Sequence, residues 1–94
     1  MKLIHGNCID FLKTLPDQSI DNIFADLPYG NGTEYNSYED TEENLAKLVN
    51  AFMPEALRVA KRIAITPGTG NITLYPKSTW TLAWVNEAGN SRCW

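Results

Sequence analysis

The spacing of hydrophobic positions predicts an alternation of helices and strands along the chain. The strongest pattern lies between residues 41 and 60, where apolar side chains recur every three or four positions and predict a long helix. Asp40 is expected to cap its start, and Pro54 is expected either to kink it or to divide it in two. A shorter stripe of the same period predicts a helix after Asn7, which is its expected N-cap.

Short apolar segments bounded by turn residues are typical of strands. Such segments are residues 2–5, 20–25, 62–66 and 79–85. The order strand, helix, strand at the start of the chain predicts parallel pairing through a right-handed crossover. Trp80 and Trp84 share one parity in the last segment and are expected to face the core. The pattern therefore predicts an α/β fold with a mostly parallel sheet and flanking helices.

A turn with candidate chemistry follows the strand predicted at residues 20–25. It consists of Asp26, Leu27, Pro28, Tyr29 and Gly30. Ligands of open α/β sheets bind at the carboxyl ends of strands. The Asp26 carboxylate and a backbone carbonyl of Leu27 or Pro28 could accept the two hydrogens of an exocyclic amino group, and these bonds would strengthen as positive charge develops on nitrogen. The ring of Tyr29 offers a face for stacking, so the turn predicts a pocket for a base flipped out of a duplex.

These residues resemble a known family. The turn at residues 6–8, the short helix after it and the motif at residues 26–29 resemble the amino-group DNA methyltransferases, which use S-adenosylmethionine to methylate adenine N6 or cytosine N4. Residues 63–68 and 80–84 also look like that family, so the resemblance covers nearly the whole chain. It implies a partial Rossmann-like methyltransferase fold, with adenine N6 preferred as the target over cytosine N4.

The resemblance also implies roles for individual residues. The catalytic motif would be Asp26, Leu27, Pro28 and Tyr29, and the cofactor would lie near Asn7, Cys8 and Asp26. No metal is implied. Two positions depart from the usual pattern: Leu27 stands where proline is usual, and Asn7 stands where aspartate is usual.

The Gly-rich cofactor loop of the family comes well after the catalytic motif and is not expected within this chain. The turn at residues 67–71 is not a substitute, because no helical pattern follows it. We therefore expect residues 1–94 to be a single truncated methyltransferase-like domain whose activity alone is doubtful. The alternatives are a non-catalytic remnant or interaction module with the same half-fold, and a methyltransferase that acts on RNA or protein.

Composition limits the partners that the chain is expected to hold by itself. Its 94 residues carry a net charge of −3, and only Arg58, Lys61 and Arg62 cluster, which predicts a solvated helix end and weak binding to DNA. An unpaired sheet edge would be covered by a second copy or a complementing chain. Cys8 and Cys93 are expected to be free thiols in the cytoplasm, since neither a signal peptide nor a membrane-spanning run is evident.

Overall fold

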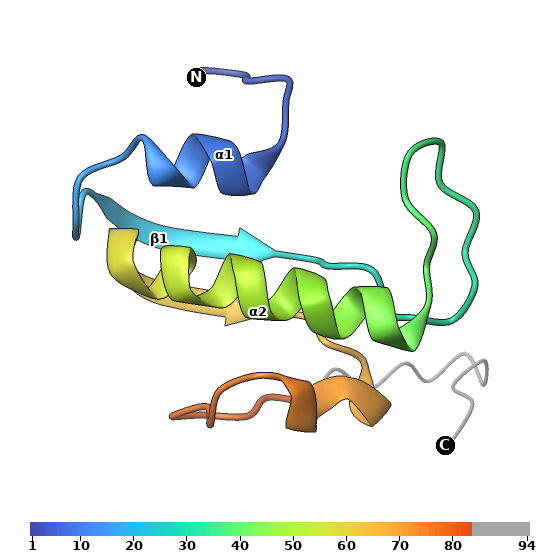
Figure 1. The fold of residues 1–94 in the computed structure, drawn as a ribbon. Helices are drawn as coiled ribbons and strands as arrows, with labels where there is room; N and C mark the ends of the chain where they lie inside the picture. The colour runs from blue at the N-terminus through green and yellow to red at the C-terminus, as the bar shows by residue number, and fades with distance from the viewer. Residues whose placement is uncertain (84–94) are drawn as a thin grey trace.

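A computed structural model describes residues 1–83 of the chain. Its elements are α1 (Cys8–Lys13), β1 (Ile20–Ala25), α2 (Glu42–Val59), β2 (Ala60–Ile65) and a 3-10 helix, η1 (Thr69–Leu74). Figure 1 shows α2 running alongside the two strands, with α1 next to β1. The architecture of this part is therefore α/β, as predicted.

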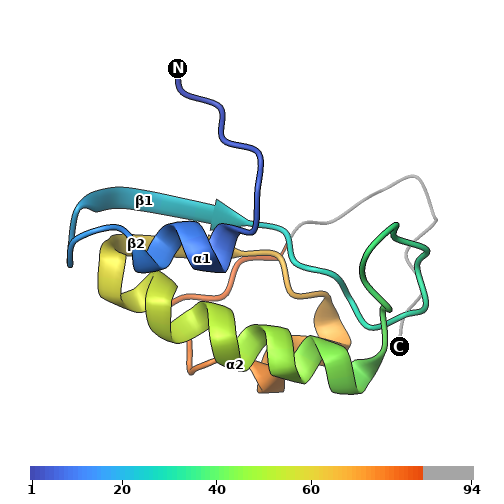
Figure 2. The ribbon, with the colours of Figure 1, turned by 45° about the horizontal axis from the view of Figure 1, so that its top comes forward.

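The sheet consists of β1 and β2, which lie parallel and are connected through α2. Their register pairs Ile20 with Ala60 at one end and Ala25 with Ile65 at the other. The carboxyl ends of both strands therefore reach the same edge of the sheet (Figure 2). Parallel pairing was predicted, but the crossover that produces it is α2 and not the shorter helix at the start of the chain.

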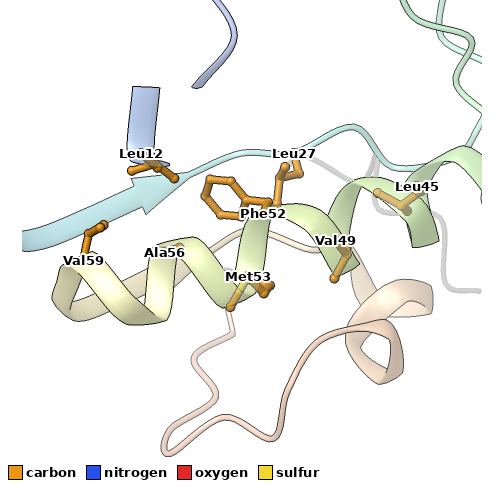
Figure 3. Packing of buried hydrophobic residues seen from close by; sticks show 8 residues of the cluster. All are labelled: Leu12, Leu27, Leu45, Val49, Phe52, Met53, Ala56 and Val59. Carbon is orange, nitrogen blue, oxygen red and sulfur yellow. The ribbon is translucent and has the colours of Figure 1, made fainter. Parts of the chain in front are cut away.

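The hydrophobic core lies between α2 and one face of the sheet. Helix α2 provides most of the buried cluster, and Leu12 of α1 and Leu27 of the turn after β1 complete it (Figure 3). Ile23, Ile63 and Ile65 pack against this cluster from the strands. Phe24, which alternates with these inward-facing residues, is 74% exposed. The apolar stripe predicted for residues 41–60 is confirmed as core.

Helix α2 begins one residue later than the sequence indicates. Thr41 is its N-cap, and the hydroxyl of Thr41 accepts a 3.1 Å hydrogen bond from the backbone N–H of Asn44. The prediction that Asp40 caps the helix is wrong, because its carboxylate binds a different set of amides. The helix runs unbroken through Pro54, whose side chain is exposed on the solvent side. Water can there satisfy the carbonyl that the missing proline N–H leaves free.

The end of α2 is fastened to the start of the chain by Arg58. Its guanidinium donates to the carbonyls of Leu12 and Leu15 at 3.0 and 2.8 Å, and to the carboxylate of Asp17 at 2.7 Å. The Leu12 carbonyl also accepts from the backbone N–H of Leu15, so the guanidinium adds a second bond to the last turn of α1. The prediction of a solvated helix end is therefore wrong for Arg58, and Lys61 belongs to β2 instead of the helix.

Two predicted strands do not form in the described part of the chain. Residues 2–5 are extended but unpaired, and Leu3 among them is 84% exposed. Residues 79–83 are also irregular, and Trp80 is 82% exposed instead of lying in the core. Trp84 and the rest of that prediction lie outside the described residues. An apolar pattern forms a strand only when a partner strand satisfies its backbone, and neither segment has such a partner within residues 1–83.

Candidate functional site

The candidate motif leaves the sheet where β1 and β2 end together. Ala25 is the last residue of β1, and its carbonyl accepts a 3.2 Å hydrogen bond from the backbone N–H of Thr66, the first residue after β2. This bond extends the ladder by one step beyond the paired residues. It places Asp26 and Thr66, which are 40 positions apart in sequence, next to each other at the carboxyl edge of the sheet.

Two hydroxyl groups converge on one oxygen of Asp26. The Thr66 hydroxyl and the Tyr29 hydroxyl both donate to Oδ1, the latter over 2.7 Å. These bonds, that of Thr66 first and that of Tyr29 second, hold the pKa of the exposed Asp26 carboxyl below its ordinary value. Within residues 1–83, Oδ2 of Asp26 has no hydrogen-bond donor. An ionised carboxylate therefore presents one occupied oxygen and one open oxygen.

Tyr29 is held from two directions while part of its ring remains accessible. The hydrogen bond to Asp26 is the main cause of a raised pKa for its phenol, which therefore stays protonated as a donor. Its carbonyl accepts a 2.9 Å bond from the amide of Asn71, which also donates to the carbonyl of Pro67. Gly68 lies against the ring: a Cβ at that position would be 3.6 Å from Cδ1 of Tyr29. The side chain is nevertheless 40% exposed.

Leu27 and Pro28 connect the exposed carboxylate to the core. The side chain of Leu27 is buried in the cluster that includes Phe52, as Figure 3 shows, and Pro28 is half-buried. In the part of the chain that the structure describes, neither the Leu27 nor the Pro28 carbonyl accepts a hydrogen bond. The turn thus combines a buried anchor with two unused backbone acceptors beside Asp26.

Asp40 organises the backbone that follows Tyr29. Its buried carboxylate accepts from the N–H groups of Gly30, Asn31 and Thr33 at 2.8, 3.1 and 3.2 Å, and its carbonyl accepts from Gly32 at 3.0 Å. Four successive amides therefore turn toward one residue. Because Thr41 caps α2 directly afterwards, the exit of the motif is fixed to the start of that helix.

Gly30 is the point of closest contact between the motif and α2. Its φ of +69° lies in the left-handed region, and a Cβ there would meet the backbone of Glu42 at 3.3 Å. Any larger residue would have both to adopt this conformation and to push against the first turn of the helix. Gly30 therefore allows the motif to approach the start of α2 closely.

Three residues that shape the site were missed or misassigned from sequence. Thr66 and Asn71 were assigned only to a strand end and a turn, and Asp40 was assigned to a helix cap. A signal for Thr66 existed in principle, because the residue that follows a parallel neighbour of β1 must emerge beside Asp26. Nothing local indicates the roles of Asn71 and Asp40, since both depend on contacts across loops.

The predicted cofactor turn at residues 6–8 is held by the cap of α1. The Asn7 side chain caps α1, with its oxygen accepting from the N–H groups of Ile9 and Asp10 at 2.9 and 3.4 Å, as predicted for the cap. Asn7 and Cys8 are both exposed. Figures 1 and 2 show the N-terminal end of α1 on the side of the molecule toward which β1 points. No hydrogen bond joins this turn to the motif within residues 1–83.

Other candidate features of the described residues are structural. Tyr35 and Tyr38 pack edge to face in the loop before α2, with ring centroids 5.9 Å apart. Lys61 pairs with Asp21 at 2.8 Å across the strands. Among residues 1–83, no group of three or more potential ligands could hold a metal ion. The helices of this region are also too short or too polar to cross a bilayer.

Two proteins with similar sequences are both Type II methyltransferases. The chain is 30% identical over 99 aligned positions to the Type II methyltransferase M.BamHI of Bacillus amyloliquefaciens, with 99% of this chain covered. It is 34% identical over 79 positions to the Type II methyltransferase M.HinfI of Haemophilus influenzae, with 71% of this chain covered.

The alignments span about a fifth of each relative, namely 22% in both cases. No protein-family model matches the chain. No solved structure matches it either. The sequence similarity and the position of the motif at the carboxyl end of β1 together lead to one conclusion: this chain is related to the DNA methyltransferase family.

Proposed function

We propose that this chain carries the target-base half of an S-adenosylmethionine-dependent DNA methyltransferase with a partial Rossmann-like fold. The observation that supports it most directly is the state of Asp26. One carboxylate oxygen is held by two hydroxyl groups, the other is open, and the unused Leu27 and Pro28 carbonyls lie in the same turn. Such a set of acceptors suits an amino group with two hydrogens.

The proposed reaction is a direct displacement in which an amino nitrogen of a base attacks a methyl group. Asp26 would accept one amino hydrogen through Oδ2, and a carbonyl of Leu27 or Pro28 would accept the other. These bonds become stronger as positive charge develops on nitrogen, which is how fixed acceptors stabilise a transition state. The lowered pKa of Asp26 keeps it ionised for this role at neutral pH. The exposed face of Tyr29 would support the base by stacking.

The methyl donor would supply an electrophilic methyl group, and the residues proposed to lie near it are Asn7, Cys8 and Asp26. Their chemistry fits polar groups of such a cofactor. The Asn7 oxygen is occupied by the helix cap, so its amide N–H₂ remains available to donate. Asp26 retains Oδ2 as an acceptor. The turn at residues 67–71 supports Tyr29 through Asn71, and it leads into the 3-10 helix η1, although no helical pattern was predicted after it.

Adenine N6 is the proposed target, and cytosine N4 is the second choice. Both amino groups present two donor hydrogens, so the acceptors of the turn suit either base. DNA binding by the chain alone is proposed to be weak. Arg58 and Lys61 are engaged in ion pairs with Asp17 and Asp21, so these cations are not free to form a phosphate-binding patch.

The decisive experiment measures methyl transfer from radiolabelled S-adenosylmethionine to DNA by wild type, Asp26→Asn and the control Asp21→Asn. Asp21 is an exposed carboxylate near the start of β1, at the opposite end of the strand from the motif, and it pairs with Lys61. We expect Asp26→Asn to reduce the rate at least about 100-fold, as for loss of one fixed transition-state partner, and Asp21→Asn to retain it. Equal rates above background for wild type and Asp26→Asn contradict the proposal, and calorimetry decides the case in which neither protein transfers methyl groups.

Calorimetry distinguishes an enzyme from a non-catalytic module with the same half-fold. The titrants are S-adenosylmethionine and its demethylated product, and the protein is the full chain with folding checked by circular dichroism. Absence of binding heat at high micromolar ligand would contradict autonomous activity and favour the module. Parallel assays on RNA and protein substrates test whether the acceptor is something other than DNA.

A further inference from the structure

We propose that Thr66 is a positioning residue that determines which oxygen of Asp26 meets the target amino group. Thr66 is the first residue after β2, outside the motif; its hydroxyl donates to Asp26 and its backbone N–H donates to the carbonyl of Ala25. The inference rests on the proposed function, because it assigns Asp26 the role of acceptor for an amino hydrogen.

The need for a positioning residue follows from the geometry of aspartate. Rotation about the Cβ–Cγ bond of a carboxylate is soft, and its two oxygens are chemically equivalent until one is engaged. In this site both internal donors choose Oδ1. The plane of the carboxylate is thereby set by two bonds from different elements, and Oδ2 is left as the acceptor that faces outward.

Thr66 is better suited than Tyr29 to keep this orientation during base binding. Tyr29 is expected to stack on the base, and a change in its χ1 angle would carry its hydroxyl away from Asp26. Thr66 has a β-branched side chain with few rotamers, and its backbone is held by the bond to the Ala25 carbonyl. Its hydroxyl therefore maintains the orientation of Asp26 even when the phenol moves.

The sheet register makes this contact specific. Because Ala25 pairs with Ile65, the next residue on each strand is Asp26 on one side and Thr66 on the other. A slip of one residue would bring Ile65 or Pro67 to this place, and neither has a side-chain donor. The orientation of the carboxylate is thus built into the pairing of the strands.

The test uses the full chain with three substitutions. Thr66→Val keeps the branched shape and removes the hydroxyl, Thr66→Ser keeps the hydroxyl, and Thr73→Val is a control at an exposed threonine of η1. The first readout is the carbon-13 NMR titration of the Asp26 carboxyl. The second is the affinity for a single-stranded oligonucleotide with one adenine, relative to the same oligonucleotide with purine, which lacks the amino group.

We expect wild type to prefer adenine over purine, and Thr66→Val to lose about tenfold of that preference, as for loss of a bond to a charged group. In the same variant the Asp26 midpoint should move up toward that of a free aspartate. Thr66→Ser and Thr73→Val should resemble wild type in both readouts. If Thr66→Val does not fold, Thr66→Ala removes the same hydroxyl with less bulk.

A Thr66→Val protein that retains the full adenine preference overturns this inference and leaves the proposed function intact. An unchanged Asp26 midpoint in that variant overturns it as well. A wild-type protein with no preference for adenine over purine overturns the proposed function and, with it, the role of Thr66, whatever the titration shows.

Discussion

The two turns that the sequence assigns to function, residues 26–30 and residues 6–8, differ in how the rest of the molecule holds them. The turn after β1 accepts hydrogen bonds from Thr66 and Asn71 and donates the backbone N–H of Gly30 to Asp40, and these three partners belong to separate parts of the chain. The turn before α1 is held by its own helix cap, through the side chain of Asn7. The sequence resemblance had assigned both turns to one site.

This difference concerns how firmly each part of the proposed site is held. The proposed target-base turn is supported from strand, loop and helix, so its acceptors have a defined orientation. The proposed cofactor turn is exposed and has only local support. We therefore expect perturbations to fall into two groups, with large effects around the first turn and small effects around the second.

The largest effect is expected from Asp40→Ala. The substitution leaves the amides of Gly30, Asn31 and Thr33 without their acceptor, and we expect a loss of about 3 kcal/mol in unfolding free energy. Urea denaturation measures this loss. Glu39→Ala, at the exposed neighbouring position, should stay within about 0.5 kcal/mol of wild type. Equal losses for the two variants would show that the turn does not depend on Asp40.

The next effect compares two glycines of the same loop. Gly30→Ala should cost about 2–3 kcal/mol, because it adds contact with α2 to the strain of a positive φ. Gly32 also has a positive φ, of +82°, but a Cβ there would meet open space. Gly32→Ala should therefore cost only the backbone strain of about 1 kcal/mol. Denaturation of both variants measures the difference. A similar loss for both would mean that the motif and α2 are not in close contact.

The third effect concerns pH and the bonds to Asp26. The pKa of the Asp26 carboxyl is lowered in the folded protein. The stabilisation that its hydrogen bonds give to the fold is therefore fully present above the ordinary carboxyl pKa of about 3.9, and it is lost as the pH falls through the lower pKa of the folded state. The difference between the urea midpoints of wild type and Asp26→Asn, measured from pH 2 to pH 6, gives the pH dependence of stability that is due to this carboxyl. Parallel curves for the two proteins would show that this carboxyl has the same pKa folded and unfolded.

The smallest effect is expected at the start of the chain. Leu3 is 84% exposed, and Leu3→Ala should change the unfolding free energy by less than about 0.5 kcal/mol. The same denaturation experiment checks it. A loss above about 1 kcal/mol would instead show that residues 2–5 pack as the strand that the sequence predicts. The neighbouring turn at residues 6–8 would then have more than local support, and the contrast between the two turns would disappear.

Sequence reasoning succeeded where the pattern was long or where a local rule decides the conformation. Helix α2 carries a stripe of several turns, turn residues flank β1, and Asn7 has the local geometry of a cap. The end of β2 is marked by Pro67 and Gly68, but its start at Ala60, directly after α2, lies two residues before the predicted one. Sequence reasoning failed where the outcome depends on distant partners. The short apolar segment at residues 2–5 is compatible with a strand but does not supply a neighbour to pair with.

The site shows the same division between local and distant information. The motif at residues 26–29 could be recognised because its residue types lie next to each other in sequence. Asp40 illustrates the opposite case: an aspartate before a helix predicts a cap, and Thr41 beside it satisfies the same rule. Only the folded loop shows that Thr41 takes the cap and that Asp40 takes the amides.

The register of β1 and β2 has a consequence for how this protein acquires its properties. The segment between Asp26 and Thr66 must close as a large loop before the two side chains can meet, and such closure is an entropic cost of folding. Until then, Asp26 is an ordinary acid on a disordered chain. The proposed role of Asp26 in orienting a base therefore depends on the completed crossover, and the Asp26 carboxyl can serve as a reporter of that event in refolding experiments.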